Sequence, residues 1–213
     1  MESVDTSIPP TAPMGRREKR KQEIRGRIED AAYLLFQRQG IDDTSIEQIC
    51  VEADVARRTF YGHFTNKHAL LGCLGISRLY SQAEPMLSVL MSNHRTTRGR
   101  LEAMIDYIES SFAGMNDIDR QLILLAPTTF VEDQQRQWEL GNSAINSFSQ
   151  LIEAGVELAD VNTEFSPEIL ATMVVGTLNT LTTSWCIDSR YPVFAKLEEA
   201  RVLFEKLICK DSA

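Results

Sequence analysis

The sequence offers little that could build a metal site or a catalytic centre. Its 213 residues include only four cysteines and three histidines, and no C-x-x-C or other zinc-ligand spacing occurs. His63 and His68 are five residues apart, which is the wrong step for two metal ligands on one helical face. No G-x-S-x-G segment is present, and Gly72 and Gly75 lie within a helical pattern rather than in a phosphate-binding loop. We therefore predict that the chain is not an enzyme and that it holds no metal and no cofactor.

Disulfides, export signals and membrane spans are not expected either. Residues 1–13 have no apolar run of the kind that marks a signal peptide, so we expect a cytoplasmic location. The segment from Ile169 to Ile187 is uncharged and nearly as long as a membrane span, but seven Thr, Asn and Ser side chains interrupt it. We expect a buried helix there and no membrane contact. The cysteines are too few for a disulfide framework in so long a chain, and we expect four buried, reduced thiols at Cys50, Cys73, Cys186 and Cys209.

Acidic charge dominates the chain, but it is unevenly distributed. The formal net charge is −8, which argues against a protein that coats nucleic acid by bulk charge. Residues 14–70 nevertheless carry 11 bases against nine acids, whereas residues 71–213 carry 11 bases against 19 acids. The N-terminal third can therefore hold a local basic site. Its run from Arg16 to Lys21 allows two interpretations: a basic arm that follows the DNA backbone or enters the minor groove, and a solvated flank without a role.

The apolar residues recur at three- and four-residue steps, and no segment alternates as a strand does. We predict an all-α chain of roughly nine helices after a disordered tail at residues 1–14. The first helix runs to Gly40, which ends it. Two short helices follow: a capping box of Ser45 and Gln48 opens the first, and the second extends from Ala56 to about residue 63. Longer helices are expected over residues 71–91, with a bend near Pro85, and over 100–115, 117–125, 129–158, 167–187 and 193–209.

The two short helices, joined by a tight turn, form a helix-turn-helix pattern whose second helix carries side chains suited to DNA. Its apolar residues Val55, Phe60 and Phe64 can anchor it and leave the polar residues outward. Either Arg57 or Arg58 could pair with a guanine edge in the major groove. The further candidate contacts to bases or phosphates are Thr44, Ser45, Thr59, Tyr61, His63 and Lys67.

This segment, TSIEQICVEADVARRTFYGHFTNK at residues 44–67, closely resembles the DNA-binding segment of TetR-family repressors. The resemblance implies an N-terminal three-helix helix-turn-helix DNA-binding domain over residues 15–68. It further implies a C-terminal helical domain for effector binding and dimerisation over residues 69–213. The positions of Thr59, Tyr61, His63 and Lys67 match the family's usual DNA contacts.

Two residues depart from the family pattern. Asp54 stands where the turn usually has glycine; aspartate tolerates the left-handed conformation, so we expect the turn to persist. Ala56 stands where the family often has serine or threonine. Because alanine cannot cap the second helix, Asp54 is the alternative cap.

One recognition helix reads only a few base pairs, so useful specificity normally requires a twofold dimer on a palindrome. The resemblance implies that the last two helices form a four-helix bundle with their symmetry mates, against the alternative of a self-contained buried pair. A second stripe on the penultimate helix is small and polar, with Thr172, Gly176, Asn179 and Thr183. The interface residues that we predict are Leu170, Val174, Leu178, Leu181, Trp185, Leu197 and Phe204.

The middle helices are rich in methionine and aromatic residues, which make adaptable pocket walls but equally make ordinary core. As a group they are compatible with a small, largely apolar effector, and no cluster of bases indicates a phosphorylated one. The candidate pocket residues are Met86, Met104, Tyr107, Phe112, Phe130, Trp138, Phe148 and Met173.

The sequence thus predicts a ligand-responsive transcriptional regulator, a repressor by resemblance. It would bind double-stranded operator DNA as a homodimer and be released by a small hydrophobic effector, with the helix after Lys67 as the linking lever. The alternative is a helical small-molecule-binding or interaction protein without specific DNA readout. That alternative would explain the apolar middle of the chain but not the polar residues between Arg57 and Lys67.

Overall fold

A computed structural model describes residues 15–80, 83–126 and 134–210 of the chain. The chain divides into two compact units, the first ending at His63 and the second beginning at Phe64. Ten helices occupy the described ranges, and their only β pairing is an isolated antiparallel bridge between Val161 and Cys209. The predicted all-α fold is confirmed, with one helix more than expected. The tail predicted at residues 1–14 lies outside the described residues.

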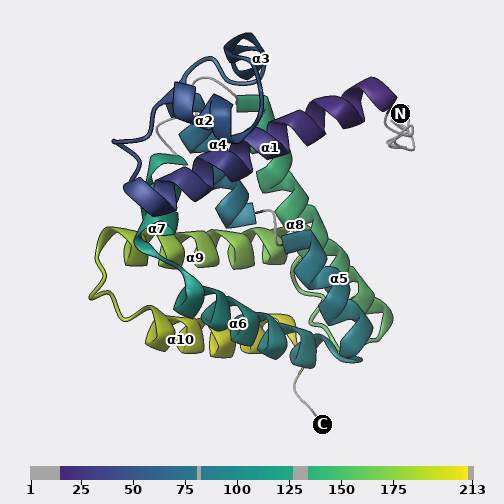
Figure 1. Cartoon of the computed structure of the whole chain (residues 1–213). Helices are drawn as coiled ribbons and strands as arrows, with labels where there is room; N and C mark the ends of the chain where they lie inside the picture. The colour runs from purple at the N-terminus through teal and green to yellow at the C-terminus, as the bar shows by residue number, and fades with distance from the viewer. Residues whose placement is uncertain (1–14, 81–82, 127–133, 211–213) are drawn as a thin grey trace. The chain divides into compact units, whose positions relative to one another are not determined.

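The first unit consists of α1 (Arg16–Gln39), α2 (Ile46–Glu52) and α3 (Arg57–Tyr61) (Figure 1). Helix α1 buries the periodic apolar face that includes Ile28, Leu35 and Phe36. It ends at Gly40, whose φ of +86° suits glycine and whose N–H donates to the Phe36 carbonyl.

The basic run is the first turn and a half of α1 itself, and its side chains are exposed. An arm that enters the minor groove is extended chain, and this segment is helical. The run from Arg16 to Lys21 is therefore an exposed basic helix end, and its contact with the DNA backbone stays a prediction.

The second unit contains seven helices within the described ranges. They are α4 (Lys67–Tyr80), α5 (Ala83–Asn93), α6 (Thr97–Gly114), α7 (Asp117–Leu125), α8 (Gln134–Glu157), α9 (Pro167–Ile187) and α10 (Val193–Ile208). Helix α9 opens as expected, with Ser166 accepting from the Ile169 N–H and Pro167 in its first turn.

The helix expected over residues 71–91 corresponds to α4 and α5, and residues 81–82 between them lie outside the described residues. Pro85 lies near the start of the described part of α5. Helix α8 continues through Gly141 without a break, and residues 129–133 of the helix predicted there lie outside the described residues.

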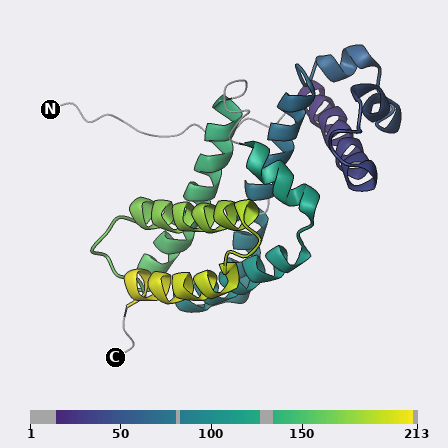
Figure 2. The ribbon, with the colours of Figure 1, turned by 90° about the vertical axis from the view of Figure 1, so that its left-hand side faces the viewer.

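The core of the second unit lies between α5, α6, α8, α9 and α10. Its fully buried members include Met104 and Ile105 of α6, Val174 of α9, and Leu197 and Phe204 of α10. Helices α9 and α10 run side by side, and α10 also packs on α6 (Figure 2). Within the described residues, no helix is both long and apolar enough to span a membrane.

Helix α6 forms one wall of a cavity, and hydrogen bonds with two other segments hold it in place. The N–H and hydroxyl of Thr97, at the start of α6, donate to the Asp160 carboxylate at 2.7 and 2.8 Å. Arg201 of α10 donates to the Glu102 carbonyl at 3.1 Å and to the Asp106 carboxylate at 2.7 Å. Helix α6 is therefore held at its first turn and again along its length.

Helices α4 and α7 approach each other closely at Gly75 of α4. A Cβ atom added at Gly75 would clash with the Leu122 carbonyl oxygen of α7, and it would lie 2.8 Å from the Leu122 carbonyl carbon and 3.0 Å from the Ala126 Cβ. The obstacle is mainly backbone, which cannot rotate away as a side chain can. The glycine is therefore what allows the two helices to pack this closely.

We predict that Gly75→Ala destabilises the second unit by about 1–3 kcal/mol, because the added methyl group must push α4 and α7 apart. Urea unfolding followed by circular dichroism measures the effect. The matched control is Gly141→Ala in α8, where an added Cβ meets no atom within 4 Å. That change should be neutral or stabilising by about 0.5–1 kcal/mol, through helix propensity alone. Equal stabilities of the two variants would contradict the close packing of α4 on α7.

Candidate nucleic-acid interface and ligand cavity

The turn between α2 and α3 is set by local hydrogen bonds. The Ser45 hydroxyl accepts from the Gln48 N–H at 3.2 Å while the Gln48 side chain accepts from the Ser45 N–H at 2.8 Å, which confirms the predicted capping box. Asp54 adopts the left-handed conformation expected of it, with φ +50°. Ala56 is the N-cap residue of α3, and no side chain caps the helix there. The alternative of Asp54 as its cap is therefore wrong.

Helix α3 is only five residues long and is anchored through one apolar side chain. Phe60 is fully buried, and its ring meets the Tyr61 ring edge-on at 5.5 Å between centroids. The side chains of Arg57, Arg58 and Tyr61 are exposed, with 45% of Tyr61 accessible, and Thr59 is half-buried. The helix therefore presents two guanidinium groups and a phenol outward, as the sequence predicted for this helix.

The two arginines of α3 have different surroundings. Arg57 forms an ion pair with Glu47 of α2, with 2.8 Å between Nη1 and the carboxylate, and its guanidinium lies 6.0 Å from the centre of the Tyr61 ring. Among the described residues, no ion pair or side-chain hydrogen bond of Arg58 is found. A ligand that approaches α3 can contact the Arg58 guanidinium directly. It can contact Arg57 only after the ion pair between Arg57 and Glu47 has broken.

The candidate contacts outside α3 fall into two groups. Thr44 is 2% exposed, and its hydroxyl donates to the Gly40 carbonyl at 2.7 Å. A side chain so enclosed cannot reach DNA, so its assignment as a DNA contact was wrong. Ser45 is half-buried, and Lys67, the first residue of α4, is also half-buried. Both remain candidates.

His63 follows α3 and is half-buried. Burial lowers the pKa of His63, and the positive charges of Arg25 and Lys21 on α1 lower it further. Its Nδ1 atom is buried and meets no hydrogen-bond partner among the described residues. At neutral pH the side chain is therefore an uncharged imidazole, which can donate one hydrogen bond to a phosphate but brings no charge to it.

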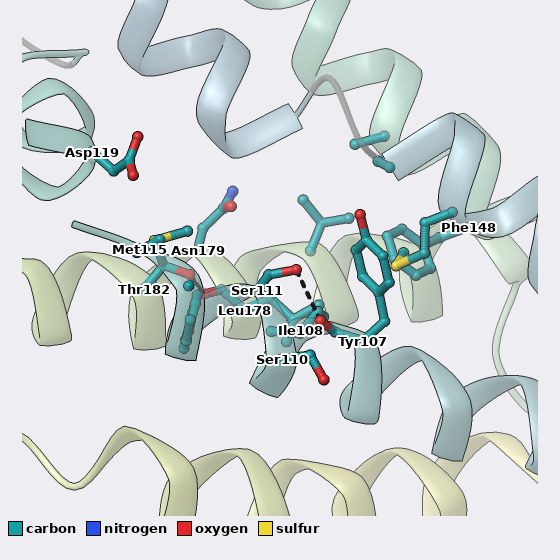
Figure 3. Close-up of a pocket in the computed structure, with 16 residues that line it drawn as sticks. Tyr107, Ile108, Ser110, Ser111, Met115, Asp119, Phe148, Leu178, Asn179 and Thr182 are labelled. Atoms are coloured by element: carbon teal, nitrogen blue, oxygen red, sulfur yellow. Dashed lines mark hydrogen bonds between the residues drawn. The ribbon is translucent and has the colours of Figure 1, made fainter. Parts of the chain in front are cut away.

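A cavity of about 350 Å³ lies within the second unit, lined by residues of α5, α6, α7, α8 and α9. Figure 3 shows Asp119 and Asn179 toward one end of it and Tyr107 and Phe148 toward the other. Its volume falls in the range of small-molecule sites, and most of its wall is apolar.

Four of the eight predicted pocket residues line this cavity: Met86, Tyr107, Phe112 and Phe148. Met104 is fully buried in the core, and Met173 packs against the core without reaching the cavity, so both assignments were wrong. Phe130 and the side chain of Trp138 lie outside the described residues.

The polar members of the cavity wall were not predicted from the sequence. They are Ser110, Ser111, Asp119, Asn179 and Thr182. A search for soft apolar residues passes over such side chains. The one available indication was the pattern Asn116-Asp117-Ile118-Asp119, a capping box that fixes Asp119 at the start of α7.

The predicted dimer-interface residues lie elsewhere than expected. Leu170, Val174 and Leu181 of α9 and Leu197 and Phe204 of α10 are buried within the protomer, and Leu178 and Trp185 pack against the same core. The five buried residues are enclosed by their own protomer, so their assignment to the interface was wrong, whereas the partly buried Leu178 and Trp185 stay predictions. The small polar stripe divides: Thr172 and Gly176 are exposed, while Asn179 lines the cavity.

The four cysteines are buried and form no disulfide, as expected. Burial raises the pKa of Cys186 and of Cys209 to about 11, and it raises the pKa of Cys50 as well. Thiols in this state are poor nucleophiles. No group of three or more potential metal ligands is found in the part of the chain that the structure describes.

The sequence profile described as "Bacterial regulatory proteins, tetR family" matches residues 28–72, which span the second half of α1, all of α2 and α3, and the start of α4. The chain belongs to the TetR family. A relative from Bacillus subtilis named "Fatty acid metabolism regulator protein" is 22% identical over 178 residues, covering 83% of this chain and 91% of the relative.

Solved structures of similar proteins extend the likeness to the whole fold of this TetR-family chain. Escherichia coli NemR in its reduced form superposes with a TM-score of 0.67 at 17% identity, covering 90% of this chain and all of NemR. NalD of Pseudomonas aeruginosa, described as the secondary repressor of the MexAB-OprM multidrug efflux pump, gives 0.61 at 20% identity over 90% of this chain and all of NalD. These likenesses concern the fold.

We predict that the stability of this TetR-family chain falls as the pH drops below the ordinary histidine pKa of about 6.5. The unfolded chain then takes up a proton that folded His63 resists, because burial, Arg25 and Lys21 lower its pKa. His63→Gln cannot titrate, so the difference in unfolding free energy between pH 7.5 and 5.5 should be smaller for the variant. Urea unfolding at both pH values measures it. An equal loss in the two proteins would show that His63 is not the group responsible.

Proposed function

We propose that this TetR-family chain is a transcriptional repressor that binds a palindromic operator as a homodimer and leaves it when a small effector fills the cavity. The observation that carries the proposal is α3, a five-residue helix held by a fully buried Phe60, with Arg57, Arg58 and Tyr61 exposed on it. A helix with this one-sided anchoring is suited to the major groove.

The side chains of α3 divide between base and phosphate contacts. Arg58, whose exposed guanidinium forms no ion pair among the described residues, is the candidate for a guanine edge. Arg57 releases Glu47 when it turns to a phosphate, and Thr59 contacts a thymine methyl group or a phosphate. The further phosphate contacts are Ser45, Tyr61, His63 and Lys67.

The names of similar proteins support repression that responds to small molecules. One relative is named for fatty acid metabolism, and NalD is described as a repressor of a multidrug efflux pump. The cavity of about 350 Å³ supplies a site for such a molecule.

The homodimer forms through the outward faces of α9 and α10. Among the exposed apolar side chains are Ile169 on α9 and Phe194, Val202 and Leu203 on α10. Thr172 and Gly176 are exposed on α9, and an added Cβ at Gly176 would meet no atom of the protomer. Small side chains let a second helix approach closely, and apolar ones favour burial, so this face suits a second copy of the chain.

Release would follow from the connection between the cavity and α4. Asp119 of α7 lines the cavity, and α7 packs against α4 at Gly75. Helix α4 begins at Lys67, which the short segment 62–66 joins to α3. An effector that displaces α7 therefore displaces α4, and it lowers operator affinity only by the difference in its affinity for the two forms.

Selection of bound sequences from random double-stranded DNA by the purified protein tests the proposal. A twofold-symmetric consensus is expected, with binding that weakens steeply as salt rises. The rival function, a helical small-molecule-binding or interaction protein, is favoured by the cavity alone. Failure to enrich any sequence would contradict the repressor and favour that rival.

We predict that Arg58→Ala lowers operator affinity by about 1–3 kcal/mol and relaxes the preference at one position of each half-site. The matched control is Arg57→Ala. Its loss of affinity should be smaller and similar for all DNA sequences, because Arg57 must give up its ion pair with Glu47 before it contacts a phosphate. Binding titrations against the selected operator and its single-base variants measure both. A larger, base-specific loss for Arg57→Ala would reverse the two assignments.

We also predict that Val202→Glu weakens dimerisation about tenfold or more, because each interface would then bury an unpaired carboxylate. Val89→Glu is the control, since Val89 is an exposed valine of the same unit on α5, which the proposed interface does not include. Sedimentation equilibrium measures the association, and circular dichroism checks that both variants stay helical. A Val202→Glu protein that dimerises like the control would exclude this face of α10.

A further inference from the structure

We propose that the effector is an amphipathic cation, with an apolar or aromatic body and a positively charged hydrogen-bond donor that binds beside Asp119. This rests on the proposed function, since it names the effector class of the same cavity. The charges on the cavity wall carry the argument. Asp119 is the only acidic side chain among the described lining residues, and none of them is Lys, Arg or His.

Burial strengthens the effect of that single charge. Asp119 is 5% exposed, so a ligand that reaches it meets a carboxylate largely screened from solvent. Electrostatic interactions are stronger in such surroundings than in water. A cationic group is therefore attracted, while an anionic group placed there would lose its hydration and be repelled.

The Asp119 side chain is also held in place. One of its carboxylate oxygens accepts from the Asn116 N–H at 3.1 Å, and the Asn116 side chain accepts from the Asp119 N–H at 3.0 Å. This reciprocal cap fixes the carboxylate before any ligand arrives, so binding costs little side-chain entropy.

The other polar groups of the wall are mostly committed to their own helices. Ser110 donates to the Asp106 carbonyl at 2.9 Å, Ser111 to the Tyr107 carbonyl at 2.8 Å, and Thr182 to the Leu178 carbonyl at 2.8 Å. Figure 3 shows Asp119 and Asn179 toward one end of the cavity and the rings of Tyr107 and Phe148 toward the other. The cavity thus has a polar, acidic end and an aromatic end.

Arg120, the basic residue that follows Asp119 in the sequence, contacts Trp185 of α9. Its guanidinium lies 4.7 Å from the centre of the Trp185 ring and donates to the Trp185 carbonyl at 2.7 Å. Trp185 in turn stacks on Phe112 of the cavity wall, with 5.0 Å between ring centroids. Arg120 is therefore separated from the lining by aromatic side chains, and it is not placed to receive an anionic ligand.

Three compounds with a phenyl ring and a four-carbon chain test the inference: 4-phenylbutylamine, 4-phenylbutanol and 4-phenylbutyrate. At pH 7 they carry a positive charge, no charge and a negative charge. Calorimetry on the full chain should rank the amine first, about tenfold tighter than the alcohol, and the carboxylate last.

Asp119→Asn removes the charge and keeps a side-chain oxygen for the helix cap. In this variant the amine and the alcohol should bind within about twofold of each other. Unchanged affinity for the alcohol would show that the cavity is still formed. The matched control is Asp117→Asn, which removes an exposed carboxylate from the same turn of α7 without touching the cavity, and which should keep the wild-type ranking.

Several results would overturn the inference. They are failure of the amine to bind the wild-type protein, a carboxylate that binds as tightly as the amine, and an unchanged ranking in Asp119→Asn. Operator release, measured separately by gel shift, distinguishes the two proposals. An amine that binds with the expected ranking but leaves the operator complex intact supports the chemistry of the cavity and contradicts its role as the effector site.

Discussion

The burial of one side chain, Phe60, is the constraint on which the exposed surface of α3 depends. A helix of five residues has almost no stability of its own, because nucleation costs more than so few hydrogen bonds return. Its orientation must come from contacts with the rest of its unit. Phe60 is fully buried, and the turn before it is fixed by Asp54 in the left-handed region. These two features decide which side chains of α3 face outward, and they leave Arg57, Arg58 and Tyr61 exposed.

The second unit connects its cavity to α4 by packing rather than by a specific bond. Asp119 lies at the first turn of α7, and Leu122, one turn further on, packs against Gly75 of α4. Closely packed helices transmit small displacements, because the interior has little free volume to absorb them. Asp119 lines the cavity and also caps α7, so a ligand that binds this carboxylate would act on the first turn of the same helix that packs against α4 through Leu122.

Local features of the structure were predictable from the sequence, and features that depend on tertiary packing were not. The Ser45–Gln48 capping box, the helix end at Gly40 and the left-handed Asp54 are determined within a few residues of chain, and all three are confirmed. Whether the apolar stripe of α9 belongs to the protomer core or to a dimer interface depends on which helix covers it. The sequence shows that Leu170 and Val174 need burial, but their own protomer and a second copy satisfy that need equally well.

The same dependence on tertiary packing explains why the exposed residues of α3 were predicted better than the residues of the cavity wall. The exposed set on α3 follows from one short amphipathic helix, whereas the cavity wall collects residues from five helices that are distant in sequence. Composition alone did not separate Met104, in the core, from Met86, in the wall. The ion pair between Glu47 and Arg57 was equally hidden, since it joins residues of two helices across a turn.

The N-terminal third of the chain and the remainder differ in net charge. Residues 14–70 are slightly basic, while residues 71–213 hold 19 acids against 11 bases. Residues 71–213 therefore repel a polyanion, while the exposed arginines of α1 and α3 attract it. Glu47, opposite Arg57, reduces even this attraction. The operator binding proposed for this chain would therefore need a few well-placed contacts rather than bulk charge, and contacts of that kind discriminate between DNA sequences.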